Sequence, residues 1–398
     1  MTQTAYPPLD DLQIRWRKIQ NALKESGADA CLTASNINIY YLTGKIFAGF
    51  VYLPAEGEPV YFVQRPADIH ENRAIPLRKP EDIPGLLKEN GRELPSVLFL
   101  EAGQLTHNEF LRLQAVFHPA STGDLTPLLR HARMIKTPWE IDQLRISAER
   151  HAAAYQKIPS VFRENMRDVE FQYEIERLMR QNGSLGIFRT YGINMDIFMG
   201  SVLTGKNAGI PSPCNFALGG AGLHASLPIG ASGETIRHGQ TVMVDMAGSF
   251  TAYMSDMSRV YSSGTIPKAA CEAHELSIRM HNRLMETGKP GVSCAGIYQW
   301  SLEMAEEAGL GAHFMGTLQQ AKFVGHGLGL EINEPPVLTA RSNEVLQAGM
   351  AIAYEPKFVF PEIGAVGIEN TYLVTADGME KLTVLKEEIQ EMTSERII

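Results

Sequence analysis

The sequence has few cysteines, no long apolar segment and no surplus of basic residues. Its four cysteines lie far apart and form no CxxC pair, which argues against a zinc ribbon or a disulfide scaffold and favours a reducing compartment. No run approaches the roughly 18–20 apolar residues of a membrane span, and the first residues show no signal-peptide pattern. Lys and Arg number 36 against 45 Asp and Glu, and this net charge of −9 does not suit nucleic-acid phosphates. We therefore expect a cytoplasmic protein that binds neither nucleic acid nor a membrane.

The remaining composition is that of a folded protein long enough for two domains. Of 398 residues, 44% are hydrophobic and 20% are charged. Apolar spacing predicts a helix over residues 10–27, and helices also near 81–90 and 106–115. Short apolar runs predict strands between them, at residues 30–34, 49–53, 59–63 and 96–100. The first part of the chain is therefore expected to be a mixed α/β unit.

A domain boundary is predicted where Pro138 opens a long helical pattern. Thr137 and Glu140 have the spacing of a capping box, and proline is tolerated at the first helical position. We place the two domains at residues 1–135 and 136–398. A further helix is predicted over residues 168–181.

The second domain contains two similar segments. In Gly239–Asp245 and in Gly349–Glu355, an apolar strand follows a glycine and ends in an acid six residues after that glycine. Each segment is followed by another acid, Asp256 in the first case and Glu369 in the second. The pattern predicts two related strand pairs that bring four carboxylates to one site. Chance similarity of two short segments is the alternative.

A buried carboxylate must be paired or bound to a metal, because an isolated buried charge is very costly. Taken singly, each of these acids more often faces solvent, so the argument depends on the set. His326 stands between glycines that let an imidazole approach a crowded site; the alternative is a loop histidine bonded to a backbone carbonyl. Four carboxylates would balance two divalent cations, and oxygen donors with one imidazole suit Mn²⁺, Co²⁺, Fe²⁺ or Zn²⁺. Two such ions can activate a shared water for hydrolysis.

These residues stand in motifs that resemble the creatinase-fold ("pita-bread") metallopeptidases, in the branch of Xaa-Pro dipeptidases (prolidases) and Xaa-Pro aminopeptidases. The motifs are Val244-Asp245-Met246-Ala247-Gly248, Ser255-Asp256-Met257-Ser258-Arg259, Gly325-His326-Gly327-Leu328-Gly329-Leu330-Glu331, Tyr354-Glu355-Pro356 and Ile368-Glu369-Asn370-Thr371. The segments 36–44 and 133–141 resemble the family's first-domain signature and its inter-domain joint. The resemblance implies an α/β fold with an N-terminal creatinase-type domain and a C-terminal pita-bread catalytic domain with a pseudo-twofold repeat. It also implies a homodimer.

The resemblance implies a dinuclear metal-dependent hydrolase of small peptides, cleaving Xaa-Pro bonds through a metal-bridged hydroxide. The implied metal ligands are Asp245, Asp256, His326, Glu355 and Glu369. Mn²⁺ is the expected metal, with Co²⁺, Zn²⁺ or Fe²⁺ as alternatives. Glu355 would also move the proton, and His224 would hold the substrate oxygen. A loop histidine packed beside glycines is the alternative for His224.

Three positions depart from the family pattern. Asn333 replaces a histidine thought to assist the reaction; it remains a catalytic candidate because an amide donates a hydrogen bond, although it cannot take up a proton. Gly367 replaces an arginine two residues before the last ligand, which removes a charged partner of the carboxylates. Lys357 replaces the glycine after Glu-Pro. These departures keep two alternatives open: a scaffold repurposed for amidine or amide hydrolysis or for a lyase reaction, and a non-catalytic binding protein.

Overall fold

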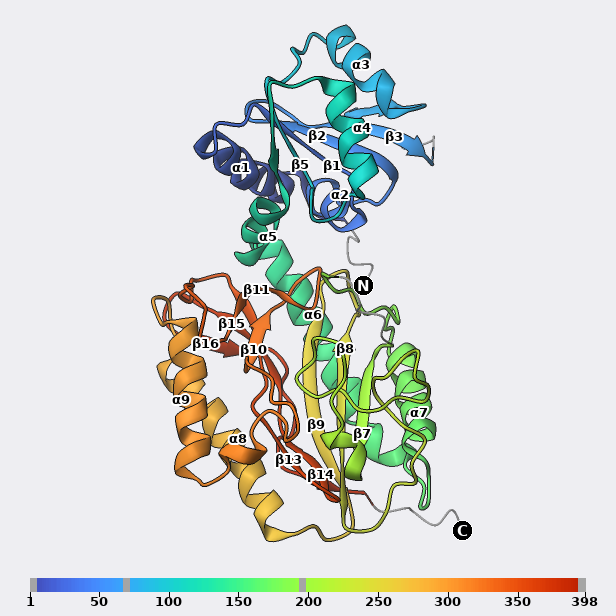
Figure 1. The fold of residues 1–398 in the computed structure, drawn as a ribbon, viewed down its shortest axis with the longest axis vertical. Helices are drawn as coiled ribbons and strands as arrows, with labels where there is room; N and C mark the ends of the chain where they lie inside the picture. Colours follow the sequence, from blue (N-terminus) through green and yellow to red (C-terminus); the bar gives the residue numbers. More distant parts are fainter. Residues whose placement is uncertain (1–5, 67–71, 193–197, 393–398) are drawn as a thin grey trace. The chain divides into compact units, whose positions relative to one another are not determined.

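A computed structural model describes residues 6–66, 72–192 and 198–392 of the chain (Figure 1). The chain divides into two compact units, one of residues 1–133 and 137–139 and one of residues 134–136 and 140–398. Residues 134–139 are divided between the two units. The predicted boundary between residues 135 and 136 lies in this segment, and its exact position stays a prediction. Among the described residues, no helix is both long and apolar enough to cross a membrane.

The first unit is built on one mixed six-stranded sheet in the order β4-β3-β2-β1-β5-β6. Its strands are β1 (Ala30–Thr33), β2 (Ala48–Pro54), β3 (Val60–Arg65), β4 (Ala74–Pro76), β5 (Val97–Leu100) and β6 (Ser121–Asp124). Its helices are α1 (Leu9–Glu25), α2 (Asn36–Thr43), η1 (Pro80–Asp82), α3 (Ile83–Glu89), α4 (His107–Phe117) and α5 (Thr126–Met134). The sequence predicted the first helix, the four strand segments and the two later helices, and the structure confirms each of them.

Helix α1 shows why the apolar spacing was informative. Leu12, Trp16, Ile19 and Leu23 form one face of the helix and are all buried. The chain then reverses at Gly27, whose φ of 69° lies in the region that glycine adopts without strain.

The second unit carries the candidate site in three sheets with strand orders β17-β9-β8-β7, β11-β10-β12-β15-β16 and β13-β14. The strands are β7 (Gly200–Thr204), β8 (Gln240–Gly248), β9 (Ser255–Ser263), β10 (Gly325–Gly327), β11 (Glu334–Val337), β12 (Ala351–Tyr354), β13 (Lys357–Phe360), β14 (Gly364–Gly367), β15 (Asn370–Val374), β16 (Met379–Lys381) and β17 (Gln390–Glu391). The helices are α6 (Pro138–Tyr155), η2 (Ile158–Val161), α7 (Asp168–Gln181), η3 (Gly205–Gly209), α8 (Lys268–Thr287), α9 (Cys294–Glu307) and η4 (Gly311–His313).

Helices cover the strands of this unit on two sides, with α6 and α7 against β7–β9 and α8 and α9 beside the other sheets (Figure 1). The helix predicted to open at Pro138 and the helix predicted over residues 168–181 are both confirmed. Because apolar side chains from both layers pack on the outer faces of the strands, the polar side chains at the inner ends of the strands can gather between the sheets.

The two predicted strand pairs are present as antiparallel ladders, β8 with β9 and β12 with β15. One detail of the prediction is wrong. Glu355 directly follows its strand, as expected, but Asp245 lies inside β8, which continues to Gly248. The reason is pairing: Asp245 is opposite Ser258, and β9 supplies partners as far as Gly248. The turn glycine and the apolar run could not reveal how far the ladder extends.

Candidate active site

The first two acids share one face of the β8–β9 ladder. Asp245 is opposite Ser258 and Asp256 is opposite Ala247, so the two acids are offset by two residues across the pair. Side chains two residues apart on a strand point to the same face. The side chains of Asp245, Asp256 and Ser258 therefore lie on one side of the ladder.

His326 is brought to this face by β10, where its two glycine neighbours are sterically required. A Cβ on Gly325 would lie 2.3 Å from the carbonyl oxygen of Ala353, and a Cβ on Gly327 would lie 2.1 Å from that of Pro335. Strands β12 and β11 thus approach the backbone of β10 more closely than any side chain allows. The glycines flanking His326 serve this close strand packing.

Hydrogen bonds join the two halves of the unit at the cluster. The Oγ of Ser258 donates to Oε2 of Glu369 at 2.7 Å, and the backbone N–H of Glu369 donates to the carbonyl of Ser258 at 3.3 Å. The hydroxyl of Thr371 accepts from the N–H of Asp256 and donates to its carbonyl, both at 2.8 Å. Because β9 and the start of β15 are tied in this way, Glu369 faces the acids of the first half.

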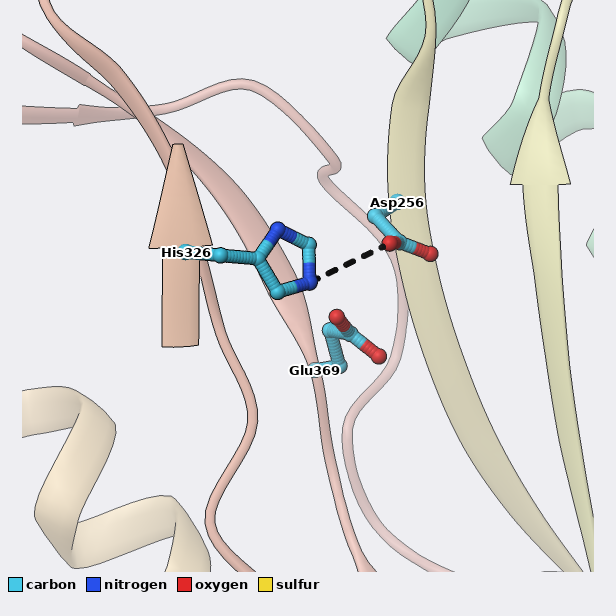
Figure 2. Close-up of side chains that lie close together, drawn as sticks. All are labelled: Asp256, His326 and Glu369. Atoms are coloured by element: carbon cyan, nitrogen blue, oxygen red, sulfur yellow. Dashed lines mark ion pairs between the residues drawn. The ribbon is translucent and has the colours of Figure 1, made fainter. Parts of the chain in front are cut away.

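The five residues that the resemblance marked as ligands lie together. Ligand atoms of Asp256, His326 and Glu369 lie within 4.8 Å of one another, a group we call the histidine trio (Figure 2). Ligand atoms of Asp245, Glu355 and Glu369 also lie within 4.8 Å of one another, and we call this group the lysine trio because all three contact Lys357. Glu369 belongs to both. The Nε2 of His326 lies 3.8 Å from Asp256 and 3.6 Å from Glu355.

The lysine trio surrounds the ammonium group of Lys357. Its Nζ donates to Oδ2 of Asp245 at 2.7 Å, to Oε2 of Glu355 at 2.6 Å and to Oε2 of Glu369 at 3.1 Å. The Lys357 side chain has no exposed surface. The sequence noted this residue as a departure but did not predict its role. A signal was present, because one lysine stands in the otherwise apolar strand Lys357–Phe360.

Burial and neighbouring charges shift the pKa values of the cluster residues in different directions. Burial raises the pKa of Asp256 well above its usual value, and the neighbouring Glu369 raises it further. Burial also raises the pKa of Asp245, but Lys357 together with hydrogen bonds to Ser258 and Glu369 outweighs burial, and the net pKa is lowered. Burial, together with Glu355, raises the pKa of Glu369 to about 8. Burial lowers the pKa of His326, against an opposing effect of Glu369. An ion held by the histidine trio must therefore compete with protons.

The lysine itself stays charged. Burial lowers the pKa of Lys357, but Asp245, Glu355 and Glu369 raise it by more, so the pKa lies well above its usual value. For Glu355, burial raises the pKa and exceeds the opposing effect of Lys357. The ammonium is therefore a fixed positive charge within the site.

The departure at Gly367 has a structural explanation. Gly367 is opposite Lys357 in the β13–β14 ladder and has a φ of 115°, a conformation that favours glycine. A Cβ there would lie 2.5 Å from the carbonyl oxygen of Pro356 and 3.0 Å from the Cα of Lys357. The expected loss of a charged partner for the carboxylates is wrong, because Lys357 supplies that charge from the facing strand.

One face of α8 positions the segment that carries Glu369, which the sequence did not predict. His274 accepts from the N–H of Gly367 at 3.1 Å, and Ser277 accepts from the N–H of Ile368 at 3.0 Å while donating to the carbonyl of Pro356 at 2.7 Å. Nε2 of His281 lies 3.1 Å from the carbonyl oxygen of Ile368. Burial lowers the pKa of His274 to about 4, so this ring is neutral. The spacing of these residues along one helix face was the available signal.

The other two candidates lie in loops. His224 is exposed, and its Nδ1 accepts from the N–H of Ser226 at 3.1 Å. Asn333 is half-buried and spans the backbone of Tyr191: Nδ2 donates to the carbonyl at 2.8 Å and Oδ1 accepts from the N–H at 2.7 Å. These contacts give each side chain a defined orientation, and the catalytic roles of both stay predictions.

The two-domain α/β fold and the buried cluster of carboxylates and histidine are those of a creatinase-fold metallopeptidase. The chain belongs to metallopeptidase family M24, whose model matches residues 142–376, and residues 15–135 match the Creatinase/Prolidase N-terminal domain. It is thus a peptidase of the family that the motifs indicated, and the predicted fold class is confirmed.

Relatives match over nearly the full chain. A Xaa-Pro dipeptidase of Pyrococcus furiosus is 25% identical over 382 residues, covering 94% of this chain and 99% of the relative. An uncharacterised peptidase of Staphylococcus epidermidis is 28% identical over 379 residues, covering 92% and 98%. Among solved structures, a prolidase from Pyrococcus horikoshii has a TM-score of 0.77 at 23% identity, covering 95% of this chain and 99% of that one. A Xaa-Pro dipeptidase from Bacillus anthracis has a TM-score of 0.80 at 23% identity, covering 96% and 99%.

Proposed function

We propose that this chain is a metal-dependent hydrolase that cleaves short peptides at Xaa-Pro bonds, as a dipeptidase or an aminopeptidase. The observation that carries the proposal is the convergence of all five implied ligands on one buried cluster in an M24 chain. The substrate class is taken from the Xaa-Pro dipeptidase of Pyrococcus furiosus, of which this chain covers 99%.

The residues of the histidine trio fit a divalent cation. Two carboxylates and one imidazole are a donor set for Mn²⁺, Co²⁺, Fe²⁺ or Zn²⁺, and we propose Mn²⁺. When bound, the cation would polarise the scissile carbonyl and lower the pKa of a water. Proton transfer would fall to Glu355, whose pKa is raised by burial and whose Oε1 lies 3.6 Å from His326.

His224 would contact the substrate through its Nε2. Because its Nδ1 accepts the N–H of Ser226, the neutral ring carries its proton on Nε2. That N–H is free to donate to the oxygen of the scissile carbonyl, where negative charge develops during attack. Asn333 is engaged at both ends of its amide with Tyr191, which supports a role in positioning the nearby loop.

The finer predictions remain proposals. The four cysteines are unpaired, which agrees with the proposed cytoplasmic location. A homodimer is proposed from the resemblance, with light scattering as its test, and so are domains at residues 1–135 and 136–398. The sequence also predicts two ions with a bridging hydroxide, and the position of Lys357 bears directly on that number.

A substrate panel tests the function. The full chain, equilibrated with Mn²⁺, is given Xaa-Pro dipeptides, Xaa-Pro-Yaa tripeptides and matched Xaa-Ala peptides. We expect cleavage before proline that a chelator abolishes and Mn²⁺ restores; preference for dipeptides or tripeptides separates dipeptidase from aminopeptidase. No turnover of any peptide by metal-loaded protein contradicts the proposal and favours a repurposed scaffold or a binding protein.

A matched pair of variants tests His224. His224→Gln should lower kcat by on the order of 10²-fold, as for loss of one donor to a developing oxyanion. His238→Gln is the control, because His238 is also an exposed loop histidine of the same unit. Equal activity of the two variants would remove His224 from the mechanism.

A further inference from the structure

The ammonium of Lys357 is placed as a metal ion would be placed. Its three N–H groups meet three carboxylate oxygens, one each from Asp245, Glu355 and Glu369, at 2.6–3.1 Å. An ammonium has three donors and no acceptor, so all of its hydrogen-bonding capacity is used. The three acceptors are the lysine trio, one of the two groups whose ligand atoms are close enough to hold a cation.

A divalent ion on the lysine trio would need the same space. It would lie about 2.0–2.2 Å from each carboxylate oxygen, on the side of the oxygens where the Lys357 nitrogen now lies. An ion placed among these three oxygens would overlap the Lys357 nitrogen, which already lies 2.6–3.1 Å from each of them. An ion beside the ammonium would also place two positive charges in contact in a buried site, which is unfavourable. With Lys357 in place, the residues do not fit a second ion.

The lysine is held by the backbone around it. Lys357 begins β13 and is opposite Gly367 of β14. Because a Cβ at Gly367 would lie 3.0 Å from the Cα of Lys357, a side chain at Gly367 would require the backbone to shift. The backbone N–H of Lys357 also contacts the sulfur of Met315 at 3.4 Å. Nothing exposes the Lys357 side chain to solvent, so leaving the trio would bury the ammonium without partners.

Of the histidine trio, by contrast, Lys357 contacts only the shared Glu369, which has a second carboxylate oxygen. The Nζ contacts Oε2 of Glu369, the same oxygen that accepts from Ser258. Oε1 of Glu369 therefore remains for an ion together with Asp256 and His326 (Figure 2).

We propose that the ammonium of Lys357 takes the place of one metal ion, so that this chain binds a single divalent cation through Asp256, His326 and Glu369. The inference rests on the proposed function as a metal-dependent hydrolase and departs from the prediction of two ions. Four carboxylates carry four negative charges; the ammonium balances one and the cation two. No hydroxide then bridges two ions, and Lys357 becomes a positioning residue that holds Glu355 beside the single ion.

Counting metal ions tests the inference. The full chain is saturated with Mn²⁺, desalted, and its manganese measured per chain by mass spectrometry, with the electron paramagnetic resonance spectrum as a second readout. We expect one ion per wild-type chain and no signal of an exchange-coupled Mn²⁺ pair. Lys357→Gly, which removes the ammonium and frees its space, should bind two ions and show the coupled signal. Lys136→Met is the matched control and should keep one ion, because Lys136 is a buried lysine paired with Glu334.

The outcomes separate the inference from the proposed function. Two ions in the wild-type chain overturn the inference and leave the function intact. One ion without peptide cleavage supports the inference and contradicts the function. No bound ion overturns both. Should Lys357→Gly fail to fold, anomalous scattering from wild-type crystals grown with Mn²⁺ decides: one peak beside His326 supports the inference, and a second peak between Asp245 and Glu355 overturns it.

Discussion

The histidine trio and the lysine trio are two halves of one acidic cluster, and their negative charge is balanced in different ways. The lysine trio contains three carboxylates and the histidine trio two, and Glu369 belongs to both. In the lysine trio a side chain of the protein supplies the cation, and the pKa of Asp245 is lowered despite burial. In the histidine trio burial raises the pKa of Asp256. The comparison teaches that one lysine can balance the charge of half of an acidic cluster permanently, and that the other half has no such partner and would depend on an ion.

The largest expected effect comes from removing the permanent cation. Lys357→Met should lower the free energy of unfolding of the metal-free protein by about 3–5 kcal/mol, because the buried Glu355 and Glu369 and the half-buried Asp245 lose their partner. Denaturant unfolding in the presence of a chelator measures it. Lys268→Met is the control, since Lys268 forms an exposed pair with Glu272 and should cost less than about 1 kcal/mol. If the two variants lose equal stability, Lys357 is not the charge that stabilises the lysine trio.

The second largest effect is expected on metal affinity, which should depend more on the histidine trio than on Asp245 of the lysine trio. Loss of a residue that only hydrogen-bonds to a metal ligand costs up to roughly 100-fold in metal affinity. His326→Ala should weaken Mn²⁺ binding by more than this, because it removes a ligand. Asp245→Asn should weaken binding by less than about tenfold, since Asp245 bonds Lys357. Calorimetric titration measures both. A larger loss in Asp245→Asn than in His326→Ala would place the ion on the other trio.

Support from α8 should affect both trios together, because Ser277 holds the segment that leads to the shared Glu369. Ser277→Ala leaves a buried N–H and a carbonyl without this partner and should cost about 1–3 kcal/mol of stability and about tenfold in metal affinity. Ser301→Ala is the matched control, a buried helical serine that bonds Tyr354. It should lose stability without losing metal affinity; loss of affinity in both would mean a general effect of destabilisation.

Metal binding should also depend on pH, with an effect of about tenfold for each pH unit. The pKa of Glu369 in the metal-free protein is raised to about 8, so below this pH the carboxyl holds a proton that the ion must displace. Apparent Mn²⁺ affinity should therefore rise about tenfold per pH unit up to about pH 8 and level off above it. Titrations between pH 6 and pH 9, with proton release measured in two buffers, check the slope. A flat profile would mean that Glu369 is already ionised.

Patterns close together in the sequence predicted well because they depend on local physics. The face of α1 followed from apolar spacing, and the helix over residues 168–181 was predicted with its observed bounds. The glycines around His326 were understood as making room for an imidazole, and the structure adds that they make room for neighbouring strands. The five metal-ligand candidates came from two similar segments and from the family resemblance, and the structure brings them together.

Other features were missed because they depend on residues far apart in the chain. Asp245 lies within β8 because β9 pairs beyond it. Gly367 looked like the loss of a charge, since only the β13–β14 register places Lys357 opposite it. The helix face of His274, Ser277 and His281 could be read as ordinary core until its contacts with the Glu369 segment were known.

The sequence alone determined which side chains were available, namely four acids and a histidine in a fixed order. It also indicated two domains and the residues that depart from the family pattern. Only the tertiary structure decided which of the acids an ammonium reaches. Side-chain chemistry is carried by each residue, but charge neutralisation in a buried site depends on distances of a few ångströms between strands, and these distances exist only after the sheets have paired and packed.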